Sequence, residues 1–169
     1  MYVNDYEINV RVEISKHTNI KYELDEQTNV LHCDRVLHTP FEYIFNYGFV
    51  PNTWSLDNDP LDVIVLMSEP LIPGCMIKCK IVSCLQTTDD DGEDPKLIVF
   101  PIAKVDPTYK DIYDLNDIDE HTLNKIRYFF QHYKDLENKT VEVGTFLPLD
   151  ESLIIYRESL RRYDEKKKK

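Results

Sequence analysis

The sequence predicts an α+β fold, in which strands occupy the first half of the chain and helices the second. Residues 6–14 alternate between apolar and polar side chains, which is the period of a strand with one buried face. Residues 117–139 instead repeat apolar side chains at helical spacing. Because strands and helices are segregated along the chain, a small antiparallel barrel flanked by helices is the expected architecture.

Other apolar or alternating stretches, bounded by turn-forming residues, predict strands at residues 20–24, 30–33, 61–67, 76–84, 97–102 and 141–146. The polar stretch 25–29 between two of these strands is typical of a hairpin connection. Lys21 and Glu23 point to the same side of their strand, because alternate strand residues share a face. The first half of the chain therefore combines several strands with at least one hairpin.

The helix predicted over residues 117–139 begins with acidic side chains, which are favourable near the positive N-terminus of a helix. A last helix is predicted after Asp150, whose side chain would cap it, with Leu153 and Leu160 on its apolar stripe. The charged segment 164–169 is expected to be a disordered tail. We therefore predict a single domain over residues 1–163.

The chain of 169 residues carries 31 acidic and 20 basic side chains, so its formal net charge is −11. This balance disfavours nucleic acids and anionic membranes as partners, because binding to phosphate backbones depends on basic patches. No apolar run approaches the ~20 residues of a membrane span, and the first residues do not resemble a signal peptide. We therefore expect a cytoplasmic protein.

The most informative segment is the loop 57–62, which reads DNDPLD and places three carboxylates directly before an apolar strand. Such acids repel one another, and hard divalent cations, which take several carboxylate oxygens as ligands, are the simplest compensation. Taken alone, an acidic motif of this kind is more often a solvated turn. An EF-hand loop is excluded, because Asp62 stands at the position where that loop needs glycine.

A second acidic loop, residues 88–96, joins two of the predicted strands. It contains Asp89 and Asp94 and ends at Lys96. Taken alone it is typical of an exposed hairpin loop, and it gains meaning only because it shares the chain with the loop 57–62.

Together the two loops resemble the soluble family of inorganic pyrophosphatases, whose signature has the form D-x-D-P-apolar-D-apolar. Other segments between residues 6 and 146 are similar to the family in the same order. They are Glu13, Lys21-Tyr22-Glu23, Asp34-Arg35, Tyr43-x-x-Asn46-Tyr47-Gly48, Asp89 with Gly92-Glu93-Asp94-x-Lys96, and Phe129-Phe130-x-His132-Tyr133-Lys134-Asp135-Leu136-Glu137. The chain length resembles the compact bacterial form of the family.

The resemblance implies an OB-like five-stranded antiparallel β-barrel with flanking α-helices. It also implies Mg²⁺-dependent hydrolysis of pyrophosphate to two phosphates by a metal-activated water. Several Mg²⁺ ions are implied, with Mn²⁺ as a substitute, and Asp59 is the implied general base. The implied metal-binding acids are Asp57, Asp62, Asp89, Asp94, Glu13 and Glu23, the last in a supporting position.

The remaining implied catalytic residues are cations and tyrosines. Lys96 would neutralise charge near the metal ions. Arginine gives bidentate contacts to phosphate and lysine gives point charges, so such a set suits a pyrophosphate ligand. The residues implied to bind the substrate are Lys21, Arg35, Tyr47, Tyr133 and Lys134.

Two other classes of protein remain open on the residues alone. A nucleic-acid-binding OB module would need a basic groove studded with aromatic side chains, which the net charge opposes. A non-catalytic calcium-binding protein would need the acids without the cations that accompany them. The family resemblance further implies a homo-oligomer, with a hexamer favoured and a dimer or trimer as alternatives.

Overall fold

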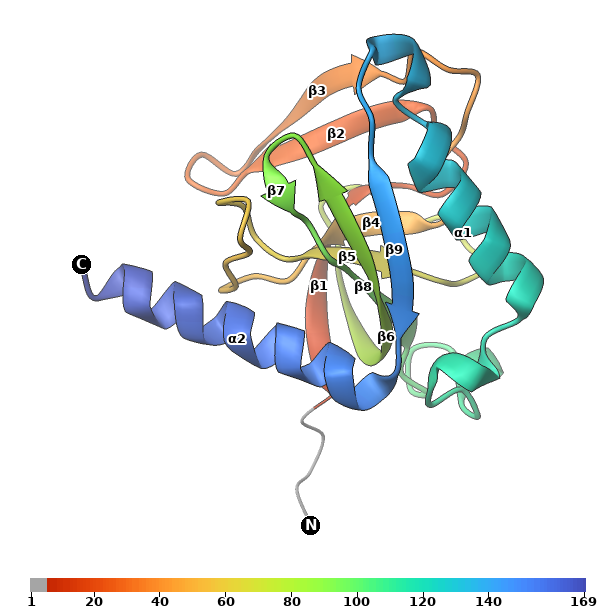
Figure 1. Ribbon diagram of the computed structural model, residues 1–169. Helices are drawn as coiled ribbons and strands as arrows, with labels where there is room; N and C mark the ends of the chain where they lie inside the picture. The colour runs from red at the N-terminus through yellow and green to blue at the C-terminus, as the bar shows by residue number, and fades with distance from the viewer. Residues whose placement is uncertain (1–5) are drawn as a thin grey trace.

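The computed structural model describes residues 6–169, which form a seven-stranded sheet, a two-stranded hairpin and two α-helices (Figure 1). The strands of the sheet are β1 (Glu7–Ile14), β4 (Asn46–Phe49), β5 (Asp62–Val65), β6 (Met76–Asp89), β7 (Gly92–Glu93), β8 (Lys96–Pro101) and β9 (Glu142–Leu147). The hairpin consists of β2 (Ile20–Asp25) and β3 (Val30–Val36), and the helices are α1 (Glu120–His132) and α2 (Leu149–Lys167). The first five residues of the predicted domain lie outside the described residues.

The sheet closes on itself around five strands. Its neighbours run in the order β1-β4-β5-β8-β6, and β1 also pairs with β6, so these strands form a ring of hydrogen-bonded neighbours. Strands β7 and β9 add to β6. The pair β5–β8 is parallel, with Ile64 opposite Ile98, so the prediction of an all-antiparallel sheet is wrong. The long connection through β6 is what allows the two strands to run in the same direction.

The two faces of the central strands enter different parts of the core. Tyr47 and Ile64 belong to an apolar cluster that includes Phe129 of α1. The neighbouring residue Val63 belongs to a second cluster, against which Leu153 of α2 packs. Because side chains alternate along a strand, each central strand contributes to both clusters. Burial on both faces explains why β5 and β8 read as continuous apolar runs in the sequence.

The helices differ from the prediction at their ends. The side chain of Asp119 caps α1 by accepting a hydrogen bond from the N–H of Thr122, and the helix ends at His132 rather than at residue 139. A separate 3₁₀ turn, Asp135–Glu137, follows, while the turns Pro107–Tyr109 and Leu115–Asp117 precede α1. The predicted helix thus included the turn Asp135–Glu137, which the structure separates from α1.

The last helix begins earlier and ends later than expected. Pro148 occupies the N-cap position of α2, so Asp150 lies in the first turn and does not cap the helix. The helix continues to Lys167 and so includes residues 164–167 of the segment that was expected to be a disordered tail. Among residues 6–169, no helix combines the length and the apolar character that crossing a membrane requires.

Strand β4, which the sequence pattern did not predict, lies close against β1. A Cβ atom added to Gly48 would be 1.9 Å from the carbonyl oxygen of Arg11, a distance that no side chain can adopt. Gly48 pairs with Val12 across this ladder. The absence of a side chain at residue 48 is therefore what lets the two strands pair.

We expect Gly48→Ala to lower the free energy of unfolding by about 3 kcal/mol or more, because the added methyl group would push β4 away from β1. Urea denaturation monitored by circular dichroism measures this change. Gly144→Ala is the matched control, since its Cβ would lie 3.1 Å from Cβ of Gln86, a milder contact than that at Gly48, and a loss of about 1 kcal/mol is expected. If Gly48→Ala and Gly144→Ala lower the free energy of unfolding by equal amounts, this account of the β1–β4 pair is contradicted.

Candidate active site

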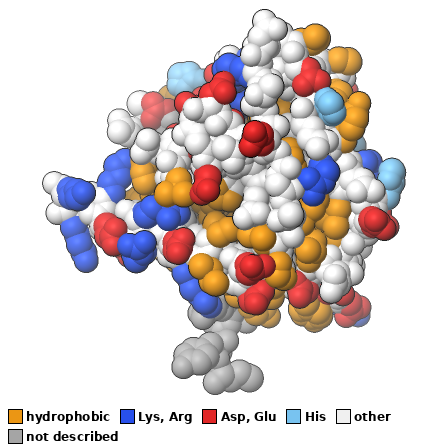
Figure 2. Space-filling model, in the orientation of Figure 1, with side chains coloured by type: hydrophobic (Ala, Val, Ile, Leu, Met, Phe, Trp, Pro, Cys, Tyr) orange, Lys and Arg blue, Asp and Glu red, His pale blue; other side chains and the backbone are white. Residues whose placement is uncertain are grey.

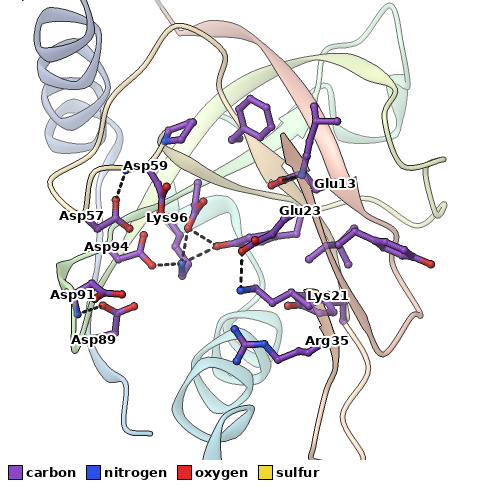
Figure 3. Close-up of a pocket in the computed structure, with 18 of the residues that line it drawn as sticks. Glu13, Lys21, Glu23, Arg35, Asp57, Asp59, Asp89, Asp91, Asp94 and Lys96 are labelled. Atoms are coloured by element: carbon purple, nitrogen blue, oxygen red, sulfur yellow. Dashed lines mark hydrogen bonds and ion pairs between the residues drawn. The ribbon is translucent and has the colours of Figure 1, made fainter. Parts of the chain in front are cut away.

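A cavity of ≈ 610 Å³ lies between the hairpin β2–β3, the loop before β5 and the β6–β7 turn (Figure 3). Its lining includes every residue that the sequence marked as a site residue. They are Glu13, Lys21, Glu23, Arg35, Tyr47, Asp57, Asp59, Asp62, Asp89, Asp94, Lys96, Tyr133 and Lys134. The fold thus gathers residues from distant segments around one space, although their individual roles remain predictions.

The loop 57–62 forms one side of the cavity. The N–H of Ser55 donates to the carbonyl oxygen of Asp59 at 2.7 Å, and the N–H of Asp59 donates to Oδ1 of Asp57 at 3.2 Å. Asn58 adopts a left-handed conformation with a φ of 69°, which lets the chain turn sharply between the two acids. Asp62 follows as the first residue of β5. Two acids therefore lie on a closed turn and the third on a strand of the sheet.

The buried ammonium group of Lys96 lies at the centre of the acidic side (Figure 3). Its Nζ donates to Asp62 at 2.9 Å, to Asp94 at 2.8 Å and to the hydroxyl of Tyr47 at 2.7 Å. Burial alone would lower the pKa of Lys96, but the two carboxylates outweigh it and hold that pKa well above its usual value. Lys96 is therefore a fixed positive charge that uses all three of its donor positions.

Several acids nearby are not fully compensated. Burial raises the pKa of Asp57 and of Asp62 to about 7, and the charge of Asp94 adds to the effect at both. Burial also raises the pKa of Glu13 to about 8, although its Oε2 accepts a hydrogen bond from the N–H of Leu24 at 2.8 Å. Asp94 differs, because Lys96 outweighs burial and lowers its pKa. The acidic side therefore holds negative charge that favours a proton or a cation.

Asp59 has a different environment from the two acids that flank it. It is exposed, and its pKa is raised by partial removal from water and then by the charges of Glu23 and Asp94. An acid whose pKa is shifted toward neutrality accepts protons more effectively at neutral pH. Asp59 therefore has the properties of a proton acceptor at the edge of the acidic side.

The opposite side of the cavity carries cationic side chains on the hairpin (Figure 3). Nζ of Lys21 lies 3.3 Å from Glu23 and 3.5 Å from Asp34. Arg35 is held from two directions, by Asp34 at 2.8 Å from its Nε and by Glu137 at its terminal nitrogen. These ion pairs fix the two cations at the cavity.

Tyr133 and Lys134 reach the cavity because α1 ends just before them. Tyr133 is the C-cap residue of the helix and is buried. The pKa of Lys134 is lowered, chiefly by burial and then by the charge of Lys21. The early end of the helix, which the sequence did not predict, is therefore what turns both residues toward the site.

Other lining or supporting residues were not predicted as site residues. Asp34 and Glu137 stood within segments that match the family, which is the signal that sequence reasoning left unused, and the structure shows that both contact Arg35. Asp91, Lys139 and Trp54 line the cavity from loops whose sequence carries no periodic pattern. The acidic loop 88–96 singled out in the sequence includes Asp91, whereas the positions of Lys139 and Trp54 follow from the tertiary fold.

The donors fit divalent metal ions by their chemistry. The lining contains ten carboxylates against five cationic side chains, which is the excess of hard oxygen ligands that Mg²⁺ prefers. Within the part of the chain that the structure describes, no group of three acidic, histidine or cysteine side chains is already arranged to hold an ion. Asp62 and Asp94 instead share the ammonium group of Lys96, at 2.9 Å and 2.8 Å from its Nζ.

A mixed sheet with two flanking helices, and a cavity that opposes carboxylates to lysine and arginine, define an enzyme that acts on a phosphate-containing anion. The comparisons with known proteins agree. The family model for inorganic pyrophosphatase matches residues 10–164, and the chain belongs to the inorganic pyrophosphatase family. We therefore assign it the hydrolysis of pyrophosphate.

The similarity extends over nearly the whole chain. The inorganic pyrophosphatase of Helicobacter pylori is 44% identical over 155 residues, which are 91% of this chain and 90% of that protein. The enzyme of Saccharolobus solfataricus is 43% identical over 96% of this chain and 92% of its own length. The solved structure of the Helicobacter pylori enzyme superimposes with a TM-score of 0.93 over 95% of each chain, at 43% identity. Membership of this family favours an enzyme over the nucleic-acid-binding and calcium-binding alternatives.

The raised pKa of Asp57 predicts how the stability of the metal-free protein depends on pH. The pKa of Asp57 is near 3.8 in the unfolded state and about 7 in the folded state. At pH values between these two, the folded state binds more protons at Asp57 than the unfolded state does. The contribution of Asp57 to the free energy of unfolding therefore falls as the pH rises through this window. Asp57→Asn should accordingly be more stable relative to wild type at pH 8 than at pH 4.

Urea denaturation in the presence of a chelator at both pH values tests this expectation. Asp90→Asn removes one charge outside the cavity lining and controls for the change in net charge. If the free energies of unfolding of Asp57→Asn and wild type differ by the same amount at pH 4 and pH 8, the proposed environment of Asp57 is contradicted.

Proposed function

We propose that the cavity hydrolyses pyrophosphate to two phosphates with Mg²⁺ held on its acidic side and with Asp59 as the general base. The observation that carries this proposal is the arrangement of one cavity, in which partly buried carboxylates with raised pKa values face the cations of the hairpin. Phosphoryl transfer depends mainly on positioning and on charge neutralisation, and the two sides of the cavity supply both.

The acidic side supplies the metal ligands in this proposal. Asp57, Asp62 and Asp94 would hold one ion, Asp89 would contribute with Asp94, and Glu13 would hold a further one. Glu23 supports this set through Lys21. A bound divalent ion lowers the pKa of a coordinated water and neutralises phosphoryl charge. Mn²⁺ shares the preference for carboxylate oxygens and is the expected substitute.

Asp59 would accept the proton of the attacking water. It is exposed to the cavity, and its raised pKa brings its basicity closer to neutral pH. Its position between Asp57 and Asp62 in the chain keeps it beside the acids without requiring it to share their role. The turn 55–59 holds its backbone through the hydrogen bond from the N–H of Ser55.

The opposite side supplies donors for the substrate. Arg35 is oriented by Asp34 and Glu137, so its guanidinium group is already fixed before an anion arrives. Lys21, Lys134 and Tyr133 complete the proposed set around the same space. The hydroxyl of Tyr47 donates to Asp62 at 2.7 Å and accepts from Lys96, so contact with a phosphate would require Tyr47 to exchange one of these bonds.

Three further features complete the proposal. The ring of β1, β4, β5, β8 and β6 would be an OB-like barrel, as its closed pairing supports. The enzyme would act as a homo-oligomer, with a hexamer favoured by the family resemblance. It would work in the cytoplasm.

We expect enzyme dialysed against a chelator to release no phosphate from pyrophosphate, because the acidic lining repels a polyanion when no cation neutralises it. Added Mg²⁺ should restore turnover, and Mn²⁺ should restore it in part. Ca²⁺ should inhibit, since its longer ligand distances and looser geometry suit it poorly to a site adapted to Mg²⁺. Phosphate release measured with each metal tests the proposal, and full activity without metal would rule out the metal-dependent mechanism.

The two proposed roles within the loop are separated by Asp59→Asn and Asp62→Asn. Asp59→Asn should lower kcat by about 10² to 10⁴-fold, the usual contribution of a general base, with little change in the Mg²⁺ requirement. Asp62→Asn should raise the Mg²⁺ concentration needed for activity, and excess Mg²⁺ should recover part of the rate. Higher pH should help only Asp59→Asn, because hydroxide replaces the lost base.

Titration of Mg²⁺ against both variants at two pH values provides the measurement. Recovery of Asp59→Asn by metal, with no recovery of Asp62→Asn, would show that the two roles are reversed.

A further inference from the structure

We infer that helix α2 positions the acidic loop of the active site through the backbone of Trp54, with Arg162 as the main positioning residue. This inference rests on the proposed function in one respect, which is the metal-binding role proposed for Asp57. The contact between helix and loop is a matter of geometry. Neither Trp54 nor any residue of α2 belongs to the segments that matched the family signature.

Both polar groups of the Trp54 backbone bind to α2. The N–H of Trp54 donates to the carbonyl oxygen of Ser159 at 3.0 Å. Nε of Arg162 donates to the carbonyl oxygen of Trp54 at 2.9 Å. A backbone unit held at both its donor and its acceptor has little freedom to shift relative to the helix.

The helix presents one face to the loop. Ser159, Arg162 and Lys166 are spaced three and four residues apart, so they lie on the same side of α2. Ser159 is fully buried and small, which allows the loop to approach the helix backbone. Nζ of Lys166 lies 3.2 Å from the centroid of the Trp54 ring, a cation–π contact. Figure 2 shows basic side chains gathered at this end of the helix.

Trp54 transmits this contact to the site. Trp54 lines the cavity, and it precedes Asp57 by three residues. The turn that follows is closed by the hydrogen bond from Ser55 to Asp59, so it moves as a unit with Trp54. On the other side, the N–H of Val50 donates to the carbonyl oxygen of Leu61 and closes the base of the loop. The two hydrogen bonds of the Trp54 backbone then attach the loop to α2.

The test compares Arg162→Met with Arg161→Met. Both changes remove a guanidinium group from the same turn of α2, but Arg161 is exposed and forms an ion pair with Glu165 at 2.7 Å on the same helix. Lys166→Met and Lys168→Met form a second matched pair, in which only Lys166 contacts Trp54. Trp54 is the single tryptophan of the protein, so its fluorescence emission reports directly on the loop.

We expect Arg162→Met to raise the Mg²⁺ concentration for half-maximal activity by about 3- to 10-fold, the effect of one lost hydrogen bond on the placement of Asp57. The kcat at saturating Mg²⁺ should change by less than about two-fold, since the residues proposed to contact the substrate are unchanged. The emission of Trp54 should shift to longer wavelength, as it should in Lys166→Met. Arg161→Met and Lys168→Met should match wild type in all three measurements.

If the role of Arg162 is purely structural, Arg162→Met will have a lower melting temperature but an unchanged Mg²⁺ requirement and unchanged Trp54 emission. This result would overturn the inference. The emission measurement requires no metal. If wild-type activity proved independent of Mg²⁺, the proposed function would fail, while unchanged emission in Arg162→Met and Lys166→Met would separately overturn the contact between helix and loop. Lys166 is exposed, so its variant should fold even if Arg162→Met does not.

Discussion

The ion pairs of the buried Lys96 with Asp62 and Asp94 are the interactions on which the site depends. Asp62 begins β5 and Lys96 begins β8, and the parallel pairing of these strands places the two residues opposite each other. The register of the sheet thus sets the separation of the two charges. An acidic side without this ammonium group would hold several buried carboxylates in mutual repulsion. The parallel pair, which the sequence pattern did not predict, is therefore central both to the core and to the chemistry.

Much of the site could be predicted from the sequence, because its residues form short motifs in a fixed order. The strands β1 and β2 were also predictable, since their side chains alternate. The parallel direction of β8 was not, because direction depends on the path of the chain between strands. The helical state of residues 164–167 was missed because local charge suggested disorder, whereas Lys166 gains a tertiary contact with Trp54. Tertiary contacts outweighed local composition at this end of the chain.

The positions of Asp34 and Glu137 show a further limit of sequence reasoning. Each belongs to a segment that matched the family, yet the partner of each became evident only in the fold. Both carboxylates hold Arg35, one from the adjacent residue and the other from the turn after α1. The second contact joins two elements that are far apart in the sequence, and no periodic pattern reports such a contact.

The two sides of the cavity belong to separate sheets. Strand β2 pairs with β3 and with no strand of the larger sheet among the described residues, so no backbone ladder spans the cavity. Side chains make the connection instead, and Glu13 of β1 does so by accepting the N–H of Leu24 at 2.8 Å. The hairpin is therefore joined to the rest of the site by side chains such as Glu13, whereas Asp62 and Lys96 stand on neighbouring strands of the closed ring.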